Sequence, residues 1–206
     1  MDFPERFMVS GTDTGIGKSL VSAVLTLGLG GVYWKPVQSG LEGETDTEFV
    51  RRVTGLGAEH FRPERWRLNE PLSPHAAAAI DGVEIALDDF ELPEHREGPL
   101  VVEGAGGLLV PLNGRHMIID LAERLELPVL LTVRSELGTL NHTFLSLEAL
   151  RRRDIPVLGV VMNGPRNRSN REAIERFGEV EVLAEIEPLE EINPGALECE
   201  FQKFNA

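Results

Sequence analysis

The sequence predicts an α/β fold in which a mostly parallel β-sheet is flanked by helices, and three observations support this class. Short, continuously apolar segments recur along the chain, for example at residues 7–9, 99–102 and 128–133. Segments with a helical spacing of apolar residues alternate with them. A glycine-rich turn joins the first apolar segment to the first helical one. Such an alternation indicates βα units around a parallel sheet whose strands are buried on both faces.

Apolar runs and helical spacing place the elements along the chain. The expected strands are 7–9, 32–34, 99–103, 128–133, 156–162 and 180–186. The expected helices are 20–27, 45–53, 75–80, 116–125, 139–153 and 170–177. Glycines at 28–31 end the first helix, and Ser73 is expected to be the N-cap of the third, with Pro74 in its first position.

Three stretches have no helical or strand pattern. Residues 35–40 contain proline and glycine, and we expect a loop there. Residues 55–72, rich in Arg, Pro and Glu, are expected to be an irregular surface excursion. The tail beyond Pro188 is acidic and permits no prediction of an element.

Composition limits the class of protein. A chain of 206 residues with 42% apolar residues suits one domain, 1–206, with a sizeable core. The formal net charge of −14 argues against a nucleic-acid partner. No apolar run approaches the roughly 18 residues of a membrane span, and residues 1–6 lack the pattern of a secretory signal. With one cysteine, Cys199, the chain is expected to be cytoplasmic and to bind no membrane.

The glycine-rich turn has the features of a phosphate-binding loop, and we predict a nucleotide site here. A turn between strand and helix lets backbone N–H groups surround an anion at the positive end of the helix. A lysine then reaches the terminal phosphates, and the next hydroxyl binds a magnesium ion. A turn that merely needs glycine would not explain the Lys-Ser pair. The predicted nucleotide-binding residues are Gly11, Thr12, Asp13, Thr14, Gly15, Ile16, Gly17, Lys18 and Ser19.

Polar residues follow other predicted strands at the edge where ligands bind in parallel sheets. They are Lys35 and Ser39, Glu103, and Asn163. We expect them to converge with the phosphate loop on one crevice. The chain has 17 arginines and only three lysines among its 20 basic residues, which favours a chemical role for Lys18 and Lys35.

The residue types predict a site for phosphoryl transfer. Magnesium prefers carboxylate, hydroxyl and phosphate oxygens, which Ser19, Glu103 and Asp46 would supply. Position alone favours another interpretation of Asp46, as part of a solvated helix face or as a partner of the helix dipole. Lys18 and Lys35 would flank the transferred phosphoryl group as negative charge spreads over its oxygens.

Two further segments have open interpretations. Glycines 104, 106 and 107 either form a simple turn or let a substrate approach the backbone closely. The segment Gly138, Thr139, Leu140, Asn141 and His142 predicts a helix start capped by Thr139 or Asn141. Its N–H groups would alternatively bind a substrate carboxylate.

Six stretches occur in an order that resembles one known family. They are GTDTGIGKS at 11–19, KPVQSG at 35–40, EPLSPH at 70–75, VEGAGG at 102–107, LGTLNH at 137–142 and VMN at 161–163. Together they resemble the dethiobiotin synthetases, ATP-dependent enzymes of biotin synthesis. The resemblance implies a homodimer with a seven-stranded parallel sheet that binds ATP, Mg²⁺, CO₂ and 7,8-diaminopelargonic acid.

The resemblance also implies a reaction path. One amine of the diamine captures CO₂ as a carbamate, whose oxygen takes the γ-phosphoryl group of ATP. The second amine then closes a cyclic urea and expels phosphate.

Roles for individual residues follow from the same resemblance. Thr14 and Lys18 would contact phosphates, while Ser19, Asp46 and Glu103 would surround magnesium. Lys35 and Ser39 would hold the carbamate, near Gly106. Asn163 would meet the adenine ring. The distal carboxylate of the diamine would reach Gly138, Thr139, Leu140 and Asn141 from across the dimer interface.

The sequence departs from the family at some points. Gly15 stands where some members carry a glutamate, and the segment before Asp46 is short. The region after Asn163 matches only at Glu185, Ile186 and Pro194, so selectivity for the nucleotide base stays open.

An alternative is a deviant phosphate-loop switch ATPase of the MinD/ParA type, which cycles on a membrane or on DNA. The loop lacks the additional early lysine of that group, and the tail at 185–200 is acidic rather than basic. A cobyrinate-type amidoligase would need a nucleophilic cysteine and a glutaminase domain. A nucleotide-binding protein without chemistry would leave Lys35 and Glu103 unexplained.

Overall fold

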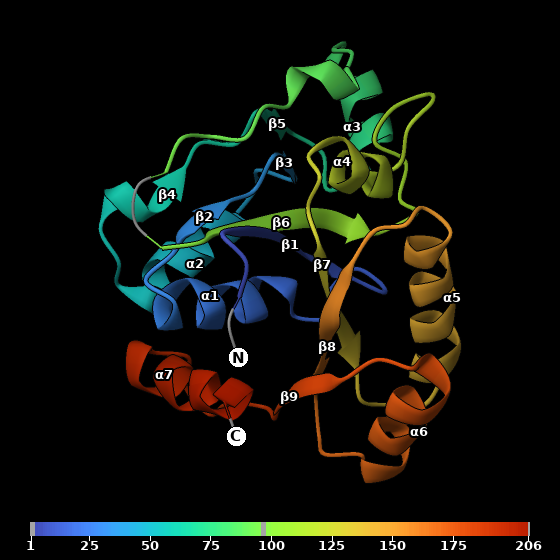
Figure 1. Ribbon diagram of the computed structural model, residues 1–206. Coiled ribbons are helices and arrows are strands. Elements are labelled where there is room, and N and C mark those ends of the chain that lie inside the picture. The colour runs from blue at the N-terminus through green and yellow to red at the C-terminus, as the bar shows by residue number, and fades with distance from the viewer. Residues whose placement is uncertain (1–2, 96–97, 206) are drawn as a thin grey trace.

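A seven-stranded sheet, parallel throughout, forms the centre of the molecule in the computed structural model, which describes residues 3–95 and 98–205 (Figure 1). Its strand order is β4-β2-β6-β1-β7-β8-β9. These strands are β1 (Arg6–Gly11), β2 (Val32–Trp34), β4 (Phe61–Arg62), β6 (Leu100–Gly107), β7 (Val129–Arg134), β8 (Val157–Asn163) and β9 (Val182–Ile186). The α/β prediction is confirmed. The first two residues of the segment inspected for a secretory signal lie outside the described part of the chain.

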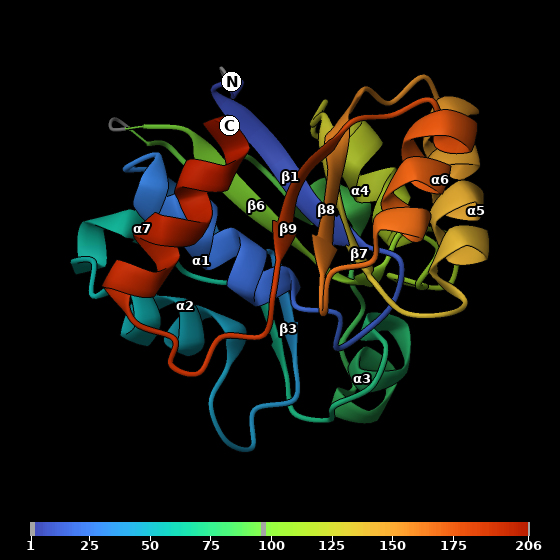
Figure 2. The ribbon, with the colours of Figure 1, turned by 90° about the horizontal axis from the view of Figure 1, so that it is seen from below.

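Helices cover both faces of the sheet (Figure 2). One face packs against α1 (Lys18–Gly28), α2 (Asp46–Thr54) and α7 (Pro194–Gln202). The other packs against α3 (Pro74–Asp81), α4 (Ile118–Arg124), α5 (Thr139–Arg151) and α6 (Arg168–Gly178). In β1, the side chains of Phe7 and Val9 belong to the core that the sheet forms with α1, α2 and α7. The side chain of Met8 belongs to the core on the opposite face. Because alternate side chains enter opposite cores, the strand has a continuous apolar run.

The excursion predicted at 55–72 contains regular structure, which corrects that expectation. A 3₁₀ turn at Ala58–His60 leads into β4, which pairs with β2 at the edge of the main sheet. Further along the same excursion, β5 (Trp66–Leu68) pairs in parallel with β3 (Val37–Ser39). β3 lies within residues 35–40, where a loop was expected. We call the β3–β5 pair the satellite sheet. It lies beside α3, and its strand β3 also contacts β6 of the main sheet (Figure 1).

Two further regions contain regular structure that the sequence did not predict, at the end of β6 and in the acidic tail. β6 does not end at Glu103 but continues to Gly107, because β1 pairs with it as far as the Gly11–Gly107 position. The acidic tail forms α7, with the Asn193 side chain accepting a hydrogen bond from the Ala196 N–H, and a final 3₁₀ turn at Lys203–Asn205.

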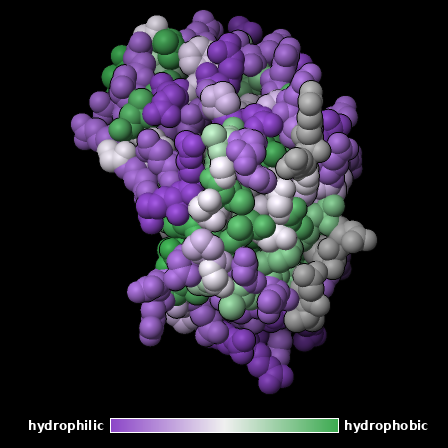
Figure 3. Space-filling view, turned by 90° about the vertical axis from the view of Figure 1, so that its left-hand side faces the viewer, coloured by the Kyte–Doolittle hydropathy of each residue, from purple (hydrophilic) through white to green (hydrophobic). Residues whose placement is uncertain are grey.

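The surface is largely hydrophilic on the side of β4, with a hydrophobic strip through its middle (Figure 3). Within the described ranges, none of the helices has the length and apolar character needed to cross a bilayer.

The strand order explains how distant residues meet. β6 lies between β1 and β2, and Tyr33 and Trp34 of β2 stand beside Val101 and Val102 of β6. Parallel strands end at one edge of a sheet. The residues that follow β1 and β2 therefore come together with the second half of β6.

Candidate active site

The turn between β1 and α1 has the backbone of an anion-binding loop. Gly15 and Gly17 have φ angles of 71° and 92°, a region that suits glycine because it has no Cβ. Gly17 is the N-cap of α1, and no side chain caps the helix. The first N–H groups of α1 are therefore available to an anion at the positive end of the helix.

Hydrogen bonds hold this loop in shape. The Asp13 carboxylate accepts from the Thr14 N–H at 2.7 Å and pairs with the Arg134 guanidinium at 2.6 Å. The Lys18 ammonium donates to the Asp13 carbonyl at 3.0 Å. From the other side, the Asn163 amide donates to the Ile16 carbonyl at 2.8 Å. The loop is thus anchored to the ends of β7 and β8.

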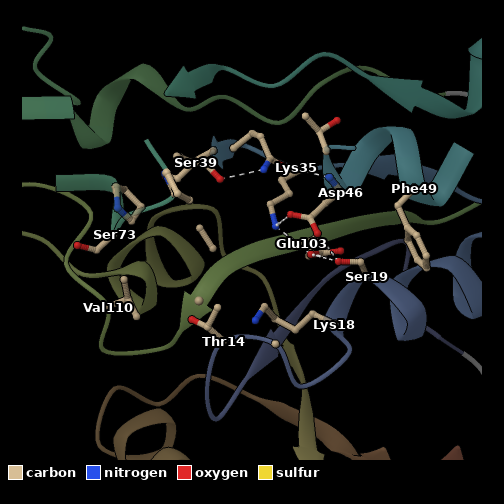
Figure 4. Close-up of a pocket in the computed structure, with 18 of the residues that line it drawn as sticks. Thr14, Lys18, Ser19, Lys35, Ser39, Asp46, Phe49, Ser73, Glu103 and Val110 are labelled. Atoms are coloured by element: carbon tan, nitrogen blue, oxygen red, sulfur yellow. Dashed lines mark hydrogen bonds and ion pairs between the residues drawn. The ribbon is translucent and has the colours of Figure 1, made fainter. Parts of the chain in front are cut away.

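A charged cluster lies across from the loop. The Lys35 ammonium lies 2.7 Å from Asp46 Oδ2 and 2.9 Å from Glu103 Oε1. The Ser19 hydroxyl lies 2.5 Å from Asp46 Oδ1 and 3.0 Å from Glu103 Oε1. We call Ser19, Asp46 and Glu103 the oxygen cluster. Figure 4 shows Lys35 and Asp46 opposite Thr14 and Lys18, with Glu103 between them.

The burial of these charges matters for their protonation. Glu103 is 1% exposed and Lys35 is 4% exposed. Burial opposes the charged ammonium of Lys35, but the carboxylates of Glu103 and Asp46 outweigh it and raise the pKa of Lys35. Burial likewise opposes the charged form of Asp46, but Lys35 and the Ser19 hydroxyl lower the pKa of that carboxyl. Burial lowers the pKa of Lys18, although Glu103 acts against this shift.

These shifts predict how stability depends on pH when metal and nucleotide are absent. A lowered Asp46 pKa contributes stability above the ordinary value of 3.8 and loses it as the pH falls further. A raised Lys35 pKa contributes stability below 10.5 and loses it at higher pH. We expect Asp46→Asn to lower the free energy of unfolding at pH 7 by about 1 kcal/mol, a value reduced by solvent screening at this partly exposed side chain.

Urea denaturation at pH 7 and pH 3.5 measures this effect. The difference between wild type and Asp46→Asn should shrink at the lower pH. Asp46 of the unfolded wild-type chain, with its ordinary pKa of 3.8, then binds a proton more readily than Asp46 of the folded chain, whose pKa is lowered. A difference that is the same at both pH values would show that the Asp46 charge contributes nothing.

The loop and the cluster line one cleft of about 650 Å³. The satellite sheet contributes Ser39 and Gln38 to its wall, and α3 contributes Ser73 and Pro74 at its start. Val110 and Phe49 also line it (Figure 4). Gly106 is a further lining residue. The predicted residues that line this cleft are Thr14, Gly15, Gly17, Lys18, Ser19, Lys35, Ser39, Asp46, Glu103 and Gly106.

The other predicted residues lie around this cleft rather than in its described lining. Gly11, Thr12, Asp13 and Ile16 form the remainder of the loop, and Asn163 lies behind it against Gly17. Thr12, Asp13 and Thr14 also line a smaller pocket of about 240 Å³, together with His142 and Leu145 of α5. The expected convergence on one crevice therefore holds for Lys35, Ser39 and Glu103 but not for Asn163.

The start of α5 differs from its predicted capping. Gly138 is the N-cap, with a φ angle of 95°, and no side chain caps the helix. The Thr139 hydroxyl lies near that of Thr143 instead, and Asn141 is exposed. The predicted cap by Thr139 or Asn141 is wrong. The Thr139 N–H donates to the Glu136 carbonyl at 3.2 Å, and the next N–H groups of α5 are available to a ligand.

Sequence reasoning missed three residues that shape the site. Tyr33 donates from its buried hydroxyl to Glu103 Oε2 at 3.0 Å. Gln38 accepts from the Asp46 N–H at 3.3 Å. Arg134 holds Asp13 from β7. Of these three residues, only Tyr33 could have been associated with the site from the sequence, because strand alternation places it on the same side of its strand as Lys35.

The oxygen cluster has the chemistry of a magnesium site that a nucleotide completes. Throughout the described residues, no group of three or more His, Cys, Asp or Glu side chains is placed to hold a metal. The cluster offers two carboxylates, each with an oxygen within 3.0 Å of the one hydroxyl. Magnesium is commonly held by one or two carboxylates, with phosphate oxygens and waters completing its octahedron. The residues present therefore fit this ion.

Comparison with known proteins gives first the class. A family model described as an AAA domain matches residues 5–196. The MinC:MinD complex of Aquifex aeolicus aligns over 98% of this chain and 94% of that chain, with a TM-score of 0.54 and 10% identity. MinD of Pyrococcus furiosus aligns over 98% and 99%, with a TM-score of 0.53 and 15% identity. At these identities the likeness concerns the fold, which together with the loop defines a phosphate-loop nucleotide-binding protein.

The sequences of curated proteins then give the family. ATP-dependent dethiobiotin synthetase BioD of Brucella melitensis is 50% identical over 198 residues, which cover 96% of this chain and 93% of that protein. The Brucella ovis protein of the same name is 49% identical over the same shares. The chain belongs to the family of ATP-dependent dethiobiotin synthetases. It is accordingly an ATP-dependent enzyme of the ligase type.

Proposed function

We propose that this chain converts 7,8-diaminopelargonic acid, CO₂ and ATP into dethiobiotin, ADP and phosphate. The observation that carries the proposal is the cleft in which Lys18, Lys35 and the oxygen cluster face one another. Two ammonium groups beside a phosphate loop suit a phosphoryl transfer, which depends on positioning and charge neutralisation. The family membership supplies the substrates.

The proposed reaction has three steps. One amine nitrogen bonds to the carbon of CO₂ and releases a proton to solvent, which leaves an anionic carbamate. A carbamate oxygen then bonds to the γ-phosphorus while the bond to the β-phosphate oxygen breaks and ADP leaves. The second amine finally attacks the carbamate carbon, phosphate departs, and the ring closes as its nitrogen loses a proton. An already anionic nucleophile needs no general-base triad.

Each residue of the cleft has a role in this scheme. The N–H groups of the loop, Thr14 and Lys18 would bind the phosphates of ATP. Ser19, Asp46 and Glu103 would hold Mg²⁺, which neutralises phosphate charge when bound. The Lys35 ammonium would orient the carbamate and stabilise the charge that develops on the migrating phosphoryl group. Ser39 supports this role because its hydroxyl is buried beside the cleft and has no hydrogen-bond partner among the described residues.

The substrate tail and the nucleotide base would lie at the margins of the cleft. The uncapped N-terminus of α5, from Gly138 to Asn141, suits the distal carboxylate of the diamine. Gly106 would let the substrate pass close to the β6 backbone. Asn163 would approach the adenine ring from the end of β8. The reaction is proposed to take place in the cytoplasm.

We further propose that the chain acts as a homodimer in which α5 lies at the interface. Leu109, Leu137 and Leu145 are 55%, 99% and 55% exposed, and Leu109 and Leu145 line the same small pocket next to the loop. Exposed apolar side chains that gather in this way mark interaction surfaces. A second subunit covering this surface would bring its own groups toward the start of α5.

Leu145→Glu tests the dimer. The change would place a carboxylate into each half of an apolar two-fold contact, and such burial of unpaired charge is strongly unfavourable. We expect a dimer for wild type and a monomer for the variant at micromolar concentration in light scattering coupled to size-exclusion chromatography. Ile80→Glu is the control, because Ile80 is 61% exposed on α3 and should leave the mass unchanged. A monomeric wild type would contradict the proposal.

The assay that tests the function measures phosphate release from ATP and Mg²⁺. It is run with and without diaminopelargonic acid and bicarbonate, and mass spectrometry detects the cyclic urea. Release that requires both additions and yields the urea supports the synthetase. Hydrolysis without substrate and without urea would instead support a switch ATPase of the MinD type, for which the present likeness concerns the fold alone.

A further inference from the structure

A buried tyrosine contacts the carboxylate at the centre of the cleft. The Tyr33 hydroxyl donates to Glu103 Oε2 at 3.0 Å, and Tyr33 is 0% exposed. Its ring packs in the core formed with α1 and α2 and meets Phe61 edge-on. Both residues are fixed by the sheet, because Tyr33 stands beside Val101 and Glu103 follows two positions later on the same face.

The two oxygens of Glu103 have different surroundings. Oε1 accepts from the Ser19 hydroxyl at 3.0 Å and lies 2.9 Å from the Lys35 ammonium. Oε2 accepts from Tyr33, the one donor that reaches it in residues 3–95 and 98–205. The side that faces the nucleotide loop therefore presents Oε1, while Oε2 is engaged within the core.

We propose that Tyr33 is a positioning residue that makes Glu103 bind the divalent cation through Oε1 alone and thereby favours Mg²⁺ over Ca²⁺. The proposal rests on the proposed function, in which Glu103 is a magnesium ligand.

The chemistry of the two cations explains the selectivity. Mg²⁺ is small and requires a near-ideal octahedron, which a single carboxylate oxygen suits. Ca²⁺ takes six to eight oxygen ligands and readily accepts both oxygens of one carboxylate. A phenol hydroxyl that keeps Oε2 engaged and fixes the carboxylate plane therefore selects the smaller ion. Groups that orient metal ligands in this way affect metal affinity strongly.

Tyr33→Phe is the decisive variant, because it removes only the hydroxyl and keeps the packed ring. Binding of the non-hydrolysable analogue AMPPNP is titrated by calorimetry against Mg²⁺ and, separately, against Ca²⁺. We expect the half-saturating Mg²⁺ concentration to rise by about tenfold or more. The Ca²⁺ value should rise much less or fall, because Glu103 is then free to use both oxygens. Binding of AMPPNP in EDTA should be unchanged.

Thr26→Val is the matched control. Thr26 of α1 is also fully buried, and its hydroxyl donates to the Ser22 carbonyl at 2.7 Å rather than to a residue of the oxygen cluster. The Thr26→Val variant should be less stable than wild type, with no change in the ratio of its half-saturating Mg²⁺ and Ca²⁺ concentrations. Equal changes for both ions in Tyr33→Phe, or none, would overturn the inference. A wild type that binds AMPPNP without any dependence on Mg²⁺ would instead contradict the proposed function.

A second measurement needs no substitution, because Tyr33 is the only tyrosine in the chain. Protein grown with 3-fluorotyrosine carries one fluorine label, next to Glu103. Its ¹⁹F resonance should shift when Mg²⁺ is added to the AMPPNP complex, and it should shift differently with Ca²⁺. A ¹⁹F chemical shift that stays the same when either cation is added would overturn the inference, even if Tyr33→Phe does not fold.

Discussion

Replacing Lys35 by alanine is expected to reduce turnover by about 10³-fold or more while nucleotide binding is largely retained. The ammonium is the one cation that touches both carboxylates of the oxygen cluster in the described chain, and it faces the cleft where the phosphoryl group would transfer. Removing a preorganised group that stabilises developing charge typically costs about 10²–10³ in kcat. Lys35 would also hold the carbamate, which increases the expected loss. Single-turnover phosphate release and AMPPNP calorimetry separate the two effects.

The same substitution should destabilise the empty protein. Glu103 is almost fully buried, and without Lys35 its charge loses its closest counterion. Removing one member of a buried ion pair costs about 3–5 kcal/mol, and we expect the lower end because Asp46 is partly exposed. Added Mg²⁺ with AMPPNP should restore much of this loss, because the metal would replace the missing positive charge.

Lys203→Ala is the matched control for Lys35→Ala. Lys203 pairs with Glu200 at 2.7 Å at the end of the chain, outside the cleft. Its loss should leave turnover unchanged. Retained turnover in Lys35→Ala would remove Lys35 from the mechanism, whatever its effect on stability.

Replacing Gly17 by alanine is expected to weaken ATP binding by about 30- to 150-fold. The φ angle of 92° is unfavourable for alanine, and its Cβ would lie 2.1 Å from the Asn163 amide nitrogen. Relief of this overlap would move Asn163 and break its hydrogen bond to the Ile16 carbonyl. Strain and the lost bond together raise the energy of the binding-competent loop by about 2–3 kcal/mol, and each 1.4 kcal/mol is a factor of about ten.

Gly15→Ala measures the backbone strain of a positive φ without the overlap with Asn163 that Gly17→Ala introduces. Gly15 also has a positive φ, of 71°, but nothing lies within 4 Å of an added Cβ. Its substitution should weaken the free energy of ATP binding only by the backbone strain of about 1 kcal/mol, which corresponds to a loss of about fivefold in affinity. Calorimetry with AMPPNP compares the two variants. Equal effects would show that the contact with Asn163 does not matter for the loop.

Much of the fold was predictable because strands buried on both faces have a distinctive sequence. β1 and β7 each contain a buried apolar run, at 7–9 and 129–131. The glycines and the Lys-Ser pair after β1 together predict a phosphate-binding loop. Lys35 and Glu103 could be expected to meet, because both follow apolar runs that a parallel sheet brings to one edge.

The satellite sheet could not be predicted from local patterns. β3 and β5 have three residues each, and β5 includes Arg67. Strands this short show no clear alternation, and their pairing joins positions about thirty residues apart. They are stabilised by tertiary contacts of both strands with α3 and of β3 with β6, which the local sequence does not predict.

The finer geometry of the site also depends on which strands pair and in which register. Strand alternation places Tyr33 on the same side as Lys35, but its contact with Glu103 depends on the register of β2 against β6. The continuation of β6 through its glycines depends on β1 as a partner. The capping of α5 by Gly138 depends on a backbone angle that no residue type fixes.

The position of the two tryptophans gives the molecule an optical property. Trp34 immediately precedes Lys35 and donates from its indole to the Pro63 carbonyl at 3.1 Å, while Trp66 pairs with Val37 on the wall of the cleft. Trp34 is 3% exposed, and Trp66 is partly exposed beneath the Arg65 guanidinium. Indole emission changes colour with the polarity around the ring. Because Trp66 pairs with Val37, a residue of the cleft wall, a displacement of the β3–β5 pair would change the polarity around Trp66 and with it the wavelength of its emission.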